Sequence, residues 1–342
     1  LAFERGLELL RAERIGEALE AFDLSLQKIC SLAPSVSHAE SYRFLGILAA
    51  LDSRPLEALQ LQKRALNLYE TLRSPFGTAK TYSSIGQTCL QLERFEEAEL
   101  FLRRAEEICR SIGAEAERAM ILGKLGSVFV KHGDFEKAIS YQTQDLELSS
   151  RFGNYRALAF SLRNLGLSYK AMGDLERAVG YLRDSRDRFA ELEDHTYLVK
   201  ADLDLVGALI DHGRVTESLG YLEEAQDYLE GRLEMSVDHV NARFHAGVSA
   251  MLTSHYSRAE SLLWQALEMS QSFALLSSQA RIHERLAELY LKKNDPGAAQ
   301  IEYLSVYRLA VENGLSELRK RAAERLLELD PDALFQELML PG

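Results

Sequence analysis

Apolar and small residues recur along the chain with the three- and four-residue spacing of amphipathic helices, in pairs of stripes separated by a short break. Between residues 155 and 193 the first stripe of one pair lies on a single helix face: Leu158, Ala159, Leu162, Leu165, Gly166 and Tyr169. A second stripe follows with the same spacing: Leu175, Ala178, Val179, Leu182 and Phe189. Gly173 and Asp174 lie between the stripes, and glycine readily ends a helix while Asp readily caps the next one. The pattern predicts a helix, a tight turn and an antiparallel second helix.

This paired pattern returns every 40 residues, with one spacing of 41. A small residue in each first helix marks the period: Gly6, Gly46, Gly86, Gly126, Gly166, Val206, Gly247 and Ala287. A second small residue follows twelve positions later: Ala18, Ala58, Ala98, Ala138, Ala178, Ser218, Ala259 and Ala299. A third site, seven residues further on, is small or short in most copies: Ser25, Ala65, Ala105, Asp145, Ser185, Ala225, Ala266 and Val306. A fixed period in this range indicates a solenoid, whose units bury their apolar faces by stacking.

The recurring small residues have a packing reason. We expect Gly166 and Ala178 where the two helices of one unit cross, because a large side chain there would push the helix axes apart. Further glycines recur at the turns. Gly133 and Gly173 lie within a unit, whereas Gly113, Gly153 and Gly314 follow the second helix, where a glycine commonly ends a helix.

Three stretches carry a family resemblance: NLGLSYKAMGDLERAVGYL at 164–182, KLGSVFVKHGDFEKAISYQ at 124–142 and SIGQTCLQLERFEEAELFL at 84–102. They resemble tetratricopeptide (TPR) repeats, although the family's standard unit has about 34 residues. Such long units are similar to those of Pins-type adaptors, kinesin light chains and bacterial regulatory TPR arrays. The resemblance implies an all-α fold, a right-handed α-α superhelix of about eight helical hairpins over residues 1–314. The stripe pattern then changes, which predicts a capping helix over 315–330 and a tail or the start of a further element over 331–342.

The overall composition narrows the range of partners. The net charge of −12 argues against a general nucleic-acid or membrane-surface binder, and no apolar run is long enough for a transmembrane helix. Cys30, Cys89 and Cys109 lie in apolar helical patterns without metal-ligand spacing, which favours reduced core thiols and a cytoplasmic location. The chain opens at Leu1 inside a helical pattern, so we expect a segment of a longer protein.

No catalytic constellation emerges from the sequence. The eight histidines are dispersed, and the metalloprotease, nucleophile-elbow, dinucleotide-binding and Walker A patterns are absent. Acidic pairs such as Glu96–Glu97 are more typical of solvated helix faces. We therefore expect no enzyme, no cofactor and no metal site.

The resemblance also implies an inner wall formed by the first helix of each unit. Six positions set by the glycine face this wall, and in the second to sixth units they hold three acidic residues: Glu40, Asp204 and Asp211. The same positions hold seven basic residues, which we call the basic stripe: Arg43, Lys80, Lys124, Lys131, Arg163, Lys170 and Lys200. Gln87, Ser127 and Asn164 on the same wall offer hydrogen bonds to a peptide backbone. These residues predict a groove that binds an extended or helical, acidic segment of a protein partner.

Other functions remain open. Relatives that bind chaperone tails pair a Lys three before the glycine with an Asn one after it, and no unit here has that pair, so such tails are disfavoured as partners. The main alternative is a regulatory or sensor array within a multidomain signalling protein that carries a protease, cyclase, kinase or transcription-factor domain. Its ligand is then a small molecule or an intramolecular segment. A third hypothesis is a scaffold that assembles end to end through uncapped repeats.

Overall fold

The computed structural model describes residues 5–6, 8–9, 17, 20–24, 35–51, 54–232, 235–313 and 315–329. Helices fill these ranges and no strand occurs in them. The first helices of successive repeats (A helices) are α3 (Val36–Leu51), α5 (Pro75–Gln91), α7 (Glu115–Lys131), α9 (Tyr155–Met172), α11 (His195–Asp211), α13 (Val237–Leu252) and α15 (Leu276–Lys292). The second helices (B helices) are α4 (Pro55–Thr71), α6 (Phe95–Ser111), α8 (Phe135–Arg151), α10 (Leu175–Glu191), α12 (Val215–Glu230), α14 (Tyr256–Ser272) and α16 (Pro296–Glu312). None of the helices in these ranges combines the length and the apolar character needed to cross a membrane.

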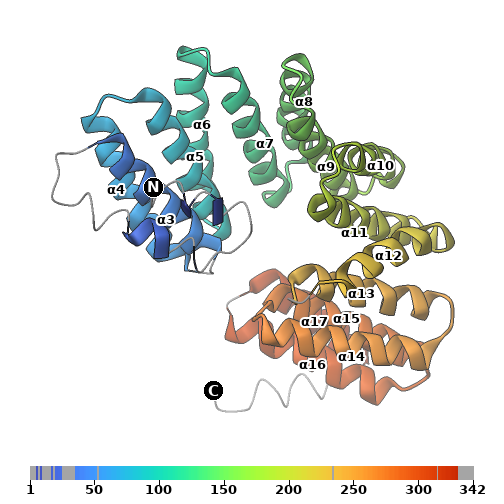
Figure 1. The fold of residues 1–342 in the computed structure, drawn as a ribbon. Helices are drawn as coiled ribbons and strands as arrows, with labels where there is room; N and C mark the ends of the chain where they lie inside the picture. The colour runs from blue at the N-terminus through green and yellow to red at the C-terminus, as the bar shows by residue number, and fades with distance from the viewer. Residues whose placement is uncertain are drawn as a thin grey trace. The chain divides into compact units, whose positions relative to one another are not determined.

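The chain forms two compact units, Leu1–Arg188 (unit 1) and Phe189–Gly342 (unit 2). Within each unit, A and B helices alternate in chain order, as the colour gradient of Figure 1 shows. In unit 1, α3, α5 and α7 each contact their own B helix and also the A helix of the next repeat. Side chains at equivalent positions of α3, α5, α7 and α9 therefore follow one another along a row of helices.

The turn within a repeat forms as the sequence predicts. α9 ends at Gly173, which has a φ of 89° and lies in the left-handed region. The Asp174 carboxylate then accepts a hydrogen bond from the backbone N–H of Arg177 at 3.1 Å, which caps the start of α10. The glycine and the cap together reverse the chain in very few residues, so the two helices of the hairpin can pack side by side.

The small residues of the A helices lie at close helix crossings, which confirms the packing prediction. A Cβ atom built on Gly166 would approach Cγ of Leu182 to 2.6 Å and its backbone nitrogen to 3.1 Å. Ala178, one turn earlier on α10, is completely buried. Helices α9 and α10 therefore pack at a separation that leaves no room for a side chain at residue 166.

Neighbouring repeats are joined through a site on the B helix that is Gln in two repeats and Leu in four. Gln62 donates a hydrogen bond from Nε2 to Oγ1 of Thr88 in the next repeat at 3.0 Å. Two repeats later Gln142 fills the same site, and Oγ of Ser168 donates to its Oε1 at 2.6 Å. Between them, Leu102 occupies the site and shares a buried apolar cluster with Val128. At these three junctions each Gln forms one hydrogen bond to a hydroxyl group, and Leu102 packs in an apolar cluster. Among the described residues, the Oε1 atom of Gln62 is buried without a hydrogen-bond partner.

The end of the array matches the predicted capping helix. Helix α17 (Ser316–Leu329) packs on α16, and its Ala322 and Leu326 join a buried cluster with Tyr303 and Tyr307. The predicted tail, residues 331–342, and Cys30 lie outside the described residues. The capping role of α17 stays a prediction.

The two described cysteines, Cys89 and Cys109, are free thiols in the core. Desolvation raises the pKa of each thiol to about 11, and neighbouring acidic residues add to the shift. At pH 8 both remain protonated, and a protonated thiol is a poor nucleophile. We expect iodoacetamide at pH 8 to modify neither residue in the folded protein and both in urea, as measured by peptide mass spectrometry. Rapid labelling of either residue without urea would contradict their burial.

Candidate functional site

The predicted groove residues divide between the two units. Lys200 lies on α11 in unit 2, with Nζ 4.9 Å from the centroid of the Tyr197 ring. The other nine are carried by the A helices of unit 1: Arg43, Lys80, Gln87, Lys124, Ser127, Lys131, Arg163, Asn164 and Lys170. Among these nine, only Lys131 is fully exposed, and the rest are half-buried or buried.

Arg43 lies deeper than the other members of the basic stripe. It is 7% exposed, and the equivalent residue of α5, Ser83, is 2% exposed. This position faces the adjacent A helix, so the packing of neighbouring repeats covers it. The guanidinium carbon of Arg43 lies 4.3 Å from the centroid of the Phe44 ring, and its buried Nε has no hydrogen-bond partner.

Lys124 reaches back across the repeat boundary toward Arg43. Its Nζ donates a hydrogen bond to Oγ of Ser83 at 2.8 Å. Burial lowers the pKa of Lys124, the nearby charge of Arg43 lowers it further, and Glu117 acts in the opposite direction. Among the residues that the structure describes, neither Arg43 nor Lys124 has an ion-pair partner. The Arg43/Lys124 pair is thus a local concentration of positive charge that no described carboxylate contacts directly.

The remaining predicted groove residues of unit 1 differ in their contacts and in their exposure to solvent. Lys80 lies with Nζ 4.8 Å from the centroid of the Phe76 ring, and Ser127 donates its hydroxyl proton to the carbonyl oxygen of Gly123. Gln87, Arg163 and Lys170 are half-buried. Their placement on one row of helices is compatible with the predicted groove, and their role in binding stays a prediction.

A buried carboxyl group that the sequence reasoning did not treat as functional lies behind this row. Asp145 on α8 is 4% exposed, and its Oδ1 accepts a hydrogen bond from Ser149 at 3.2 Å. A Cβ atom on Gly123 would lie 2.7 Å from its Oδ2 and 3.5 Å from Nδ2 of Asn164. Desolvation raises the pKa of Asp145 to about 6, against the hydrogen bonds from Ser161 and Ser149. In the sequence, this buried carboxyl group could have been recognised because Asp145 occupies the third small-residue site, which is Ala or Ser in most repeats.

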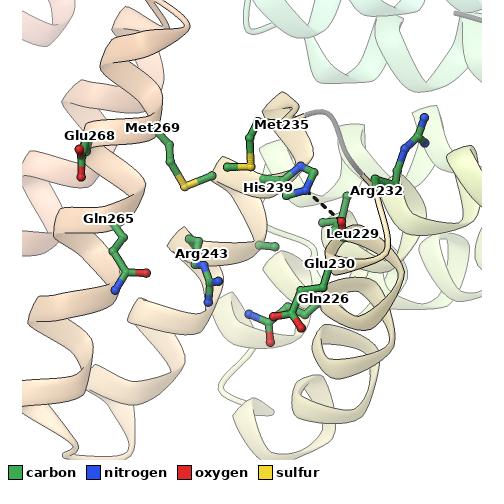
Figure 2. Close-up of a pocket in the computed structure, with 11 residues that line it drawn as sticks. Gln226, Leu229, Glu230, Arg232, Met235, His239, Arg243, Gln265, Glu268 and Met269 are labelled. Atoms are coloured by element: carbon green, nitrogen blue, oxygen red, sulfur yellow. Dashed lines mark hydrogen bonds between the residues drawn. The ribbon is translucent and has the colours of Figure 1, made fainter.

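Unit 2 contains a cavity of about 320 Å³ between α12, α13 and α14. Figure 2 shows Met235 and Met269 pointing toward each other, with Arg243 beside them between α12 and α14. His239 forms one wall: Nδ1 accepts from the backbone N–H of Ser236 at 3.0 Å, and Nε2 donates to the carbonyl oxygen of Leu229 at 3.1 Å. With both ring nitrogens used in this way, His239 is a neutral, fixed side chain. In the sequence, the only sign of this site is the one repeat spacing of 41 residues, between Val206 and Gly247.

Catalytic chemistry has no support in the described residues. No group of three or more His, Cys, Asp or Glu side chains in these ranges is arranged to hold a metal ion. His283 and Glu302, which are joined at 2.6 Å, are both largely buried and hold α15 against α16. That the protein is not an enzyme stays a prediction.

Comparison with known proteins supports the reading of the repeats. The Tetratricopeptide repeat profile matches residues 37–111 and 117–191. No curated protein sequence matches the chain significantly. Among solved structures, Aspartyl phosphate phosphatase F from Bacillus subtilis has a TM-score of 0.66 and 15% identity, with 89% of this chain and 79% of that chain covered. A Rap protein complexed with Competence and Sporulation Factor has a TM-score of 0.62 and 14% identity, with 98% of both chains covered.

A further similar structure is that of a Signal Transduction ATPase with Numerous Domains (STAND) protein from Pyrococcus horikoshii. This protein has a tetratricopeptide repeat sensor. It has a TM-score of 0.60 and 16% identity, and it covers 82% of this chain. This chain spans only 44% of the STAND protein. At these identities the similarity concerns the fold. Together with the profile match, it shows that residues 37–111 and 117–191 are tetratricopeptide repeats and that the chain is folded as a tetratricopeptide-repeat solenoid.

Proposed function

We propose that the A-helix row of unit 1 binds an acidic segment, extended or helical, of a protein partner. The observation that carries this proposal is the Arg43/Lys124 pair. The two cations lie on α3 and α7, on either side of α5, and Lys124 is near enough to feel the charge of Arg43. Both are withdrawn from water, and no described carboxylate forms an ion pair with either.

The physical argument concerns the free energy of these two charges. Withdrawing a cation from water costs free energy, which is recovered when an anion with good hydrogen-bond geometry is placed beside it. The half-buried Nζ of Lys124 and the guanidinium of Arg43 supply such geometry, with the Ser83 hydroxyl between neighbouring repeats. A Glu or Asp side chain of a partner would satisfy both charges and raise the pKa of Lys124 toward its ordinary value.

Partner binding is in keeping with the known proteins of similar fold. One Rap protein was crystallised with Competence and Sporulation Factor, and the repeats of the STAND protein are described as a sensor. The proposal for this chain rests on the Arg43/Lys124 pair and not on these similar structures.

The test uses two capped peptides of equal length, one rich in Glu and the other its Gln counterpart. We expect the chain to bind the Glu peptide more tightly, with an affinity that falls as salt is added. Lys124→Met and Arg43→Met should each weaken binding of the Glu peptide roughly tenfold, because each removes a charge-assisted hydrogen bond. Isothermal titration calorimetry measures all three effects.

Lys63→Met is the matched control, since Lys63 is an exposed cation on the B helix α4 of the same unit. It changes the net charge equally and should leave the affinity unchanged. Equal binding of the Glu and Gln peptides, or an equal loss in the Lys63 variant, would refute recognition by the Arg43/Lys124 pair.

A regulatory or sensor array is the second candidate. The cavity of unit 2 favours it, because its volume falls within the range of small-molecule sites. Both candidates are non-catalytic. A cytoplasmic location belongs to the same proposal and is supported by the buried free thiols of Cys89 and Cys109.

A further inference from the structure

The cavity of unit 2 lies where the repeat pattern is interrupted. The connection from α12 to α13 spans residues 231–236, whereas the equivalent connection from α6 to α7 spans only 112–114. Both flanking helices are also one residue shorter than the 17-residue helices of most other repeats. Consistent with this, α12 and α13 pack less closely than α6 and α7. The longer connection separates the end of α12 from the start of α13 and opens the space between them.

The apolar part of the cavity is lined by flexible side chains and is partly exposed to solvent. Leu229 is buried at its base, whereas Met235 at its rim is 54% exposed. Met269 faces Met235 from α14 (Figure 2). Methionine side chains are flexible and polarisable, so they adapt to apolar groups of different shapes. An exposed methionine at a cavity rim is also a site that loses water when a ligand binds.

Acidic and basic side chains surround this apolar part, and Glu230 and Arg243 among them do not form an ion pair with each other. Glu230 on α12 and Arg243 on α13 both line the cavity. Within the described part of the chain, neither side chain has an ion pair or a hydrogen bond. His239 cannot take either role, because both of its ring nitrogens are already engaged. Glu268 on α14 also lines the cavity without an ion pair or a hydrogen bond among the described residues. The cavity therefore offers one cation without a partner, Arg243, and two such carboxylates, Glu230 and Glu268.

We propose that this cavity binds a zwitterionic ligand of amino-acid size with an apolar side chain. Its carboxylate pairs with Arg243, its ammonium group pairs with Glu230, and its side chain lies between Met235 and Met269. An Arg guanidinium matches the planar carboxylate in a bidentate arrangement. A cation and carboxylates that line one cavity together with two methionines offer partners for both charges of an amino acid and for its apolar side chain. This inference is independent of the Arg43/Lys124 pair.

The first experiment titrates the chain with L-leucine, L-methionine and L-phenylalanine, followed by calorimetry and by the methyl resonances of Met235 and Met269. The best of the three is then compared with its N-acetyl derivative, which lacks the ammonium charge, and with its amide, which lacks the carboxylate. We expect the parent amino acid to bind at least tenfold more tightly than either derivative and to shift both methionine resonances.

Two variants assign the contacts. In Arg243→Met the parent and the amide should bind equally, because the partner of the carboxylate is gone. In Glu230→Gln the parent and the N-acetyl derivative should bind equally. Arg258→Met and Glu223→Gln are the matched controls, because both residues are exposed on α14 and α12 and neither lines the cavity. These controls should retain the wild-type preference.

Three outcomes would overturn the proposal. The first is no binding of any of the three amino acids at about 10 mM, a concentration at which even weak binding is measurable. The second is equal binding of the parent and both derivatives to the wild-type chain. The third is a loss of discrimination in the control variants as large as that in Arg243→Met and Glu230→Gln.

Discussion

Replacing Asp145 with Ser is expected to stabilise the protein at neutral pH by about 3 kcal/mol. Burial raises the pKa of this carboxyl from its ordinary 3.8 to about 6, so at pH 7 the folded state contains an ionised group in an unfavourable site. Because the pKa is higher in the folded state, the native protein binds the proton more tightly than the unfolded chain does. Stability therefore falls as the pH rises from about 4 to about 6 and then levels off. Ser occupies the equivalent site at Ser185, so the replacement suits the packing.

Urea unfolding of the wild-type and Asp145→Ser chains in dilute solution checks this result. The gain should be about 2 kcal/mol smaller at pH 4.5 than at pH 7.5, because most of the wild-type carboxyl is then protonated in the folded state. Asp184→Ser is the control, since Asp184 is exposed on the neighbouring B helix. It should change stability little at either pH. A gain from Asp145→Ser that does not depend on pH would show that ionisation of the carboxyl is not its cause.

The same substitution, Gly→Leu, is expected to have opposite effects at two glycines of one hairpin. At Gly166 the new side chain would meet Leu182 and its backbone at the crossing of α9 and α10, so the helices must separate. We expect a loss of about 3 kcal/mol, as for a severely overpacked core. At Gly180, an exposed position of α10 with nothing within 4 Å of the new Cβ, Leu should stabilise the helix by about 0.5–1 kcal/mol through its higher helix propensity.

Circular dichroism during urea titration distinguishes the two variants. Gly166→Leu should unfold at lower urea than the wild type, and Gly180→Leu at equal or higher urea. If both variants lost stability equally, the close approach of α9 and α10 at residue 166 would be refuted as the reason for the glycine.

The parts of the fold that depend on local rules were predictable from the sequence. Gly173 and Asp174 end one helix and cap the next through their own backbone and side chain, so the turn follows from two residues. The packing role of Gly166 followed from its recurrence every 40 residues. Neither inference needed knowledge of how neighbouring repeats pack on one another.

The candidate sites depend on contacts between repeats, and these were less accessible to sequence reasoning. Periodicity places Arg43 and Lys124 on the predicted helix faces. Only the packing of α3, α5 and α7 shows that Arg43 is buried and that Lys124 reaches Ser83. The burial of Asp145 likewise depends on α9, which supplies Ser161. The irregular spacing near residue 231 was visible in the sequence, yet its consequence, a cavity, follows from how the longer connection separates two helices.

The two Gln residues at the B-helix site, Gln62 and Gln142, have a consequence for the correct assembly of the repeats. Arrays of near-identical units can misassemble, either by skipping a unit or by exchanging units between molecules. If the repeat of Gln62 stacked directly on the repeat of Val128, the amide would face an apolar side chain and lose its bond to Thr88. A buried amide without a partner costs about 1–3 kcal/mol, so such a skipped arrangement is penalised at every affected junction. At the junctions of Gln62 and Gln142, the correct order of units is thus favoured by side-chain chemistry as well as by the connectivity of the chain.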